Sequence, residues 1–123
     1  MRIQKIVFTI TGLLISCFVY SQSASYFQKN EYFNKAVDLY EKEMYCSAQE
    51  QLIKAKEHIN PNDAIMLADI DFYNAMCALK NKQDDAQYLV DKILTSTPKN
   101  PNHTATAYEY AKYLFEEEKY KDA

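Results

Sequence analysis

The sequence predicts an all-α protein, and three observations carry that prediction. The 123-residue chain contains one Gly and three Pro, whereas chains with many tight turns need both residues at their reversals. Apolar residues recur at intervals of three and four, which is the period of an amphipathic helix. Asn and Pro gather in two short segments, 60–63 and 97–101, where they would end one helix and begin the next. We therefore expect antiparallel helix pairs separated by short loops.

Residues 1–21 are typical of a secretory signal peptide, because two basic residues precede a continuous apolar run. The run is shorter than the roughly 20 residues of a comfortable membrane span. We expect cleavage after Ser21, followed by a linker over 22–29. The mature protein is then expected to be exported, to the periplasm or the outer membrane of a bacterial cell.

A second processing site overlaps the first. The segment Leu14-Ile15-Ser16-Cys17 resembles a lipobox, the tetrapeptide whose Cys is acylated and becomes the new N-terminus. The apolar segment Phe18-Val19-Tyr20 argues against acylation, because a tether that leaves a membrane surface is normally polar. We therefore expect an association with the membrane only if Cys17 is lipidated.

Charge excludes one class of partner. Without the two basic residues of the signal, 12 of the 14 basic residues remain against 17 acidic ones. Nucleic acid is an unfavourable partner for a chain with this excess of acidic residues.

Two cysteines remain in the mature part, Cys46 and Cys77. Both occupy small-residue positions of helical patterns, which predicts small buried apolar side chains. A disulfide between them is the alternative, because an exported protein can meet an oxidising compartment. Neither has a second Cys or a His at ligand spacing, so no metal site is expected.

The chain repeats itself. Residues 39–48 align with 114–123, with five identities, and a degenerate third copy lies between them at 77–86. The copies end in Ala48, Ala86 and Ala123. Helix breaks such as Glu43-Met44 and the two Pro-containing joints divide the chain into three helix-pair units, with the third incomplete. The expected units are about 30–61, 62–98 and 99–123.

These residues carry a family resemblance. The pattern Tyr45-x-x-Ala48-x3-Leu52-x2-Ala55 with Pro61 resembles the tetratricopeptide repeat, in which a small residue at the crossing point lets two helices approach closely. The second unit shows Ala86-x3-Val90-x2-Ile93 with Pro98, and departs from the pattern at Gln83 and Ile93. The resemblance implies helix pairs stacked as an alpha solenoid. The signal followed by Tyr-rich repeats is similar to exported tetratricopeptide proteins of the Bacteroidetes type, of which this chain is expected to be an N-terminal fragment.

The sequence offers little catalytic chemistry. It lacks a Gly-rich phosphate loop, a nucleophile motif and a His-Glu-x-x-His motif. His58 is placed in the last turn of a helix, where a cation is favourable, and His103 in a loop beside residues expected to cap the next helix. We therefore expect no enzyme, no catalytic residue, no cofactor and no metal.

The resemblance further implies a concave groove lined by the first helix of each unit. Position by position, the expected peptide-binding groove consists of Phe33, Val37, Tyr40, Asp71, Ala75, Ala78, Tyr108, Lys112 and Phe115. The partner would be a protein or peptide. The alternative for the aromatic members is packing between helices.

The sequence is compatible with two functions. The first is a non-catalytic protein–protein interaction scaffold of the cell envelope. The second is a targeting or dimerising repeat arm of an enzyme or sensor whose active domain lies beyond residue 123.

Overall fold

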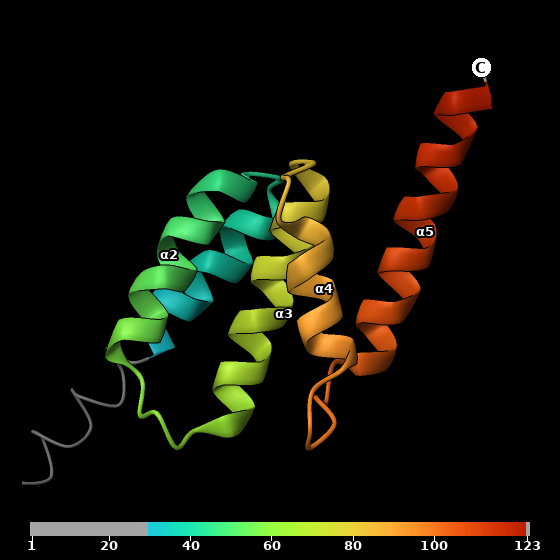
Figure 1. Cartoon of the computed structure of the whole chain (residues 1–123). Coiled ribbons are helices and arrows are strands. Elements are labelled where there is room, and N and C mark those ends of the chain that lie inside the picture. Colours follow the sequence, from blue (N-terminus) through green and yellow to red (C-terminus); the bar gives the residue numbers. More distant parts are fainter. Residues whose placement is uncertain (1–29, 123) are drawn as a thin grey trace, which may run out of the picture.

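A computed structural model describes residues 30–122 of the chain. The predicted signal peptide and linker, the lipidation site Cys17 and the third repeat residue Ala123 lie outside the described residues. Within the described part every regular element is a helix, which confirms the all-α prediction (Figure 1). A first helix spans residues 30–41, and four more follow it. They are α2 (Tyr45–His58), α3 (Ala64–Lys80), α4 (Ala86–Leu94) and α5 (His103–Asp122).

The helices pack on their neighbours along the chain. The expected break at Glu43-Met44 separates the first helix from α2, and the two Pro-containing segments separate α2 from α3 and α4 from α5. Helix α2 packs on α3, α3 on α4, and α5 on both α3 and α4. The C-terminal end of α5 projects beyond the other helices (Figure 1).

Helix α3 is the central element. Its last turns contain an uninterrupted buried stretch from Ala75 to Leu79, and a helix that is apolar on every side is stable only when neighbours cover it. Its start is fixed by Asp63, whose side chain accepts a hydrogen bond from the Met66 N–H at 3.1 Å and so satisfies a donor of the first turn.

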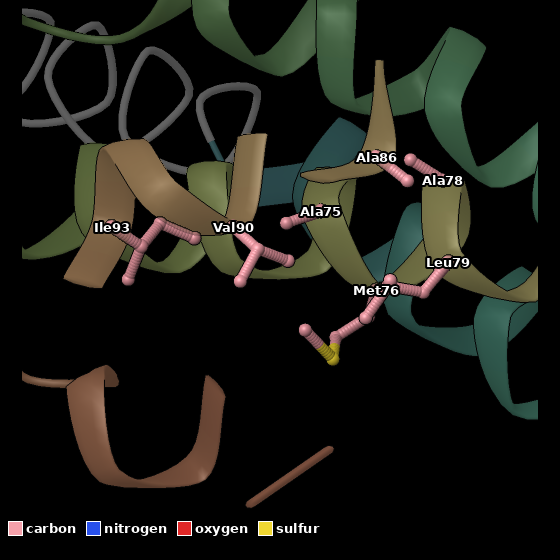
Figure 2. Close-up of a cluster of buried hydrophobic side chains, with 7 residues drawn as sticks. All are labelled: Ala75, Met76, Ala78, Leu79, Ala86, Val90 and Ile93. Atoms are coloured by element: carbon pink, nitrogen blue, oxygen red, sulfur yellow. The ribbon is translucent and has the colours of Figure 1, made fainter. Parts of the chain in front are cut away.

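Two clusters of buried side chains hold the helices together. One joins α3 to α4 and consists of Ala75, Met76, Ala78, Leu79, Ala86, Val90 and Ile93 (Figure 2). The other joins the first helix, α2 and α3 and consists of Ala36, Leu52, Ala55, Ile59 and Ile70. Ala48 and Ala86, the predicted crossing residues, are both buried. Their small size permits the close approach of paired helices.

Both helix-to-helix turns have the same geometry. In the first, Glu43 adopts a left-handed φ of 60°, its N–H donates to the Tyr40 carbonyl, and the next N–H, of Met44, donates to the Leu39 carbonyl. In the second turn Lys82 has a φ of 51°, and the same two bonds run from Lys82 and Gln83 to the end of α3. This is the Schellman arrangement that ends many helices.

The two joints between helix pairs also share a structure. In the first, the Asn60 side chain accepts a hydrogen bond from the Asn62 N–H at 2.9 Å, and in the second Asn100 accepts one from Asn102 at 2.8 Å. Such Asn turns are local and set by the sequence Asn-Pro-Asn. Pro101 is thus the structural counterpart of Pro61, whereas the repeat pattern had assigned that place to Pro98.

Candidate functional site

A hollow of about 190 Å³ lies between α3 and α5. Its lining comes from the last turns of α3, the turn that follows, and the middle of α5. The lining residues are Met76, Leu79, Lys80, Lys82, Glu109, Lys112, Tyr113, Glu116 and Glu117.

The floor of the hollow belongs to the core. Met76 and Leu79 are buried in the α3–α4 cluster, and Tyr113 packs partly buried against the same cluster. In Figure 2, Met76 lies on the side of the cluster that faces α5. An apolar floor of this kind can bury an anchoring side chain of a partner.

The walls of the hollow carry charges of both signs. At one end the Lys82 ammonium lies 2.8 Å from a Glu117 carboxylate oxygen and ties the turn after α3 to α5. Among the described residues, Lys80, Lys112 and Glu116 form no ion pair. All three side chains are exposed, so a ligand in the hollow can contact them.

In the structure, the α3 positions that correspond to the first-helix residues lie one residue after the predicted ones. The left-handed residues of the two Schellman turns, Glu43 and Lys82, are 39 positions apart in the sequence. The crossing residues Ala48 and Ala86 are 38 positions apart. The turn of the second helix pair is therefore one residue shorter. The counterparts of the predicted first-helix residues are Phe72, Met76 and Leu79. The spacing of the second helices instead predicts three other residues at these places, namely Asp71, Ala75 and Ala78.

Burial and contacts support the corrected register. Ala75 and Ala78 are 0% exposed and do not line the hollow. Asp71 forms an ion pair with Lys56 of α2 at 3.5 Å, beside a separate hollow of about 180 Å³ between α2 and α3. It does not line the hollow between α3 and α5.

On α5 the hollow is lined by Glu109, Lys112, Tyr113, Glu116 and Glu117. Tyr108 and Phe115 lie elsewhere on the helix, 68% and 58% exposed, and do not line it. Lys112, the third predicted groove residue on this helix, lines it.

Two of the predicted groove residues of the first helix, Phe33 and Tyr40, pack against other helices. The Phe33 ring lies 5.8 Å from that of Tyr73, and the Tyr40 ring lies 5.3 Å from Tyr73 and 5.5 Å from Tyr45, all edge-on. Phe33, Val37 and Tyr40 are partly buried. Interhelical packing, the alternative for these aromatic residues, is thus their observed role.

Tyr40 is also an electrostatic neighbour of the hollow. Burial and, second, the charge of Glu109 raise the pKa of its phenol to about 12, because both disfavour a phenolate. Burial also raises the pKa of Tyr45 and of Tyr73. The three phenols therefore remain neutral at physiological pH.

The cysteines fit the prediction only in part. Both are free thiols; Cys77 is buried as predicted, but Cys46 is exposed. The prediction for Cys46 is wrong because Ala48, two residues later, faces the crossing point of the helices and is fully buried.

The histidines make local contacts. His58 lies in the last turn of α2, as predicted, with its Nδ1 2.8 Å from the Lys54 carbonyl oxygen. His103 is the first residue of α5 and lies in that helix, whereas a loop position was expected. Within residues 30–122 no group of three or more His, Cys, Asp or Glu side chains could hold a metal ion. No helix in that range is both long enough and apolar enough to cross a membrane.

Two of the departures seen in the sequence have a structural explanation. Gln83 occupies a place where the family pattern has an aromatic residue, and its side-chain amide exchanges two hydrogen bonds with that of Gln49, at 2.8 and 3.1 Å. Gln49 also donates to Asn74 at 3.2 Å. A chain of amides thus links α2 to α3 and to the turn after it. Ile93, in a small-residue position, is buried in the α3–α4 cluster.

The start of α5 is held on α3 by Asn102. Its side-chain amide donates to an Asp69 carboxylate oxygen at 2.8 Å and to the Ala68 carbonyl at 3.5 Å. The Asn102 amide thus contacts α3 across the interface between the two helices. Thr106, which is buried, donates its hydroxyl proton to the Asn102 carbonyl at 2.8 Å. The Asn102 bonds hold the start of α5 beside α3.

Comparison of the chain with protein-family models, with curated proteins and with solved structures finds no match.

Proposed function

We propose that the protein is a non-catalytic interaction scaffold of the bacterial cell envelope, built from tetratricopeptide-type helix pairs, and that the hollow between α3 and α5 binds a segment of a partner protein. The observation that carries the proposal is the combination of a core-derived floor with the exposed side chains of Lys80, Lys112 and Glu116, which form no ion pair with another described residue. The floor supplies affinity through burial, and the charges select the partner and its orientation.

A solenoid arrangement of the helix pairs is part of the proposal. Two similarities support it: both helix-to-helix turns use the same left-handed residue and hydrogen bonds, and both joints use the same Asn turn. Repeated local structure of this kind makes each pair present its first helix on the same side. The hollow then lies between the first helices of two successive units.

Charge reversal at the hollow tests the proposal. The full chain is immobilised and used to retain proteins from an envelope extract of the source cells. Lys112→Glu and Glu116→Lys change exposed side chains of the hollow, while Lys92→Glu and Glu57→Lys change exposed side chains of α4 and α2 that do not line it. We expect the hollow variants to lose proteins that the wild-type chain and both control variants retain.

Two results would overturn the proposal. One is that the wild-type chain retains nothing above a blank matrix. The other is that the hollow variants and the control variants retain the same set of proteins. Circular dichroism of all four variants shows whether each remains folded, which is expected because every changed side chain is exposed.

A further inference from the structure

Cys46 and Cys77 lie at adjoining ends of two packed helices. Cys46 is the second residue of α2, and Cys77 belongs to the last turn of α3. The two helices pack on each other and are joined by a short loop, so they are antiparallel neighbours. The first turn of α2 is therefore beside the last turn of α3.

Asn81 contacts both cysteines. Its side-chain amide donates to the Cys46 sulfur at 3.4 Å, and its backbone N–H donates to the Cys77 carbonyl at 2.9 Å. Burial and, second, the charge of an ionised Cys46 raise the pKa of the Cys77 thiol to about 11. The electrostatic effect of one thiol on the other agrees with their placement at the same end of the helix pair.

The two thiols differ in their access to solvent. Cys46 is exposed and can meet a dissolved oxidant, whereas Cys77 is 0% exposed and can react only with a group inside the protein. We propose that Cys46 and Cys77 form a redox switch, in which a small disulfide oxidant converts the two free thiols into a disulfide that joins α2 to α3.

The reaction takes two thiol–disulfide exchange steps. The Cys46 thiolate attacks one sulfur of the oxidant disulfide, which forms a mixed disulfide and expels the first oxidant thiolate. The Cys77 thiol then gives up its proton, which ends on the departing second oxidant thiolate, and the Cys77 sulfur attacks the Cys46 sulfur to form the new bond. Two protein thiols are oxidised, and one oxidant disulfide is reduced to two thiols.

The disulfide would change the protein measurably. Its formation needs the two Cα atoms within roughly 7 Å, so it holds the first turn of α2 against α3. It also closes a loop that contains most of both helices, and thereby restricts the unfolded chain. We expect the melting temperature to rise by at least about 5 °C on oxidation.

The test uses the full chain with Cys17→Ser, because Cys17 would add a third thiol. The purified protein is incubated with oxidised glutathione and analysed by intact mass spectrometry and peptide mapping. The expected product is a monomer that has lost two hydrogen atoms, carries no glutathione and yields a linked peptide containing Cys46 and Cys77. Its melting temperature is higher than that of the reduced protein.

Adding Cys46→Ser to this chain provides the control, and the changed side chain is exposed, so the variant is expected to fold. In this control Cys77 should remain a free thiol and the melting temperature should not respond to glutathione. The proposal would be overturned by a lasting glutathione adduct on Cys46 with Cys77 still reduced. A dimer joined through Cys46 of two chains would overturn it as well.

Discussion

At the scale of single residues, the left-handed positions in the two turns are the clearest departures from local preference. The left-handed position at the end of a helix usually carries Gly. The chain contains one Gly, Gly12, which lies outside the described residues, and the two left-handed positions are occupied by Glu43 and Lys82. A left-handed conformation costs a residue with a Cβ about 1 to 2 kcal/mol. The rest of each turn must offset that cost.

Replacement of Glu43 by Gly is expected to stabilise the protein. Glu43→Gly relieves the steric cost but adds freedom to the unfolded chain, so the net gain in the free energy of unfolding should be about 0.5 to 1 kcal/mol. Urea denaturation measures this gain. Glu50→Gly, in the interior of α2 on an exposed position, is the matched control and should destabilise by about 1 kcal/mol. Destabilisation by both variants would contradict the turn geometry.

The buried thiol of Cys77 and the partly buried phenol of Tyr40 predict a loss of stability at high pH. The pKa of Cys77 is raised from 9.0 to about 11 and that of Tyr40 from 10.0 to about 12. Folding therefore favours the neutral form of each group. The associated stability is complete below the unfolded-state pKa of each group and is lost as pH rises through its folded-state pKa. The window runs from about pH 9 to about pH 12.

Urea denaturation at a series of pH values tests this dependence. Each group should contribute on the order of 2 kcal/mol to the loss. Tyr40→Phe removes one titrating group, so the loss between pH 10 and pH 12 should be smaller in this variant than in the wild-type chain. Equal losses in the two proteins would contradict the assignment of Tyr40.

At the scale of helices, the number and type of elements could be predicted because they depend on local signals. The apolar period, the Asn-Pro joints and the break at Glu43-Met44 are all present in consecutive residues. The register of α3 could not be predicted in this way, because the repeat alignment was anchored on Ala48 and Ala86 in the second helices. A turn shorter by one residue changes the face that α3 presents while leaving the second helices aligned.

Two other features depended on contacts between distant residues. The amide pair of Gln49 and Gln83 joins positions 34 residues apart, and only the absence of the expected aromatic residue marked the site. Cys46 has an apolar helical spacing in the sequence, yet it is exposed. Spacing alone does not specify which side of the first turn the neighbouring helix covers.

The orientation of α5 has its own test. Tyr113 packs against the α3–α4 cluster, whereas Tyr108 on the same helix is 68% exposed. Tyr113→Ala should therefore lower the free energy of unfolding by about 2 kcal/mol, and Tyr108→Ala by less than about 0.5 kcal/mol. Urea denaturation measures the free energy of unfolding of both variants, in which the same side chain is removed. A larger loss for Tyr108→Ala would mean that α5 is rotated about its axis.

At the scale of the whole molecule, α3 unites the described part of the chain. It contributes to both core clusters, forms one wall of the hollow and contacts every other helix through side chains or backbone. The exposed apolar residues Tyr108 and Leu114 lie on α5 outside the hollow. Helix α5 therefore presents the charged hollow with its apolar floor and, outside it, exposed apolar side chains.

The most direct test of the account asks which of these surfaces meets the partner. A photo-crosslinking amino acid is placed at position 116, which lines the hollow, or at position 115, the adjacent residue that does not, and the full chain is irradiated in the source cells. The account predicts a discrete crosslinked protein from position 116 and none of the same mass from position 115. A crosslink from position 115 together with none from position 116 would contradict it, and would return the binding surface to the face that the sequence repeat alone predicts.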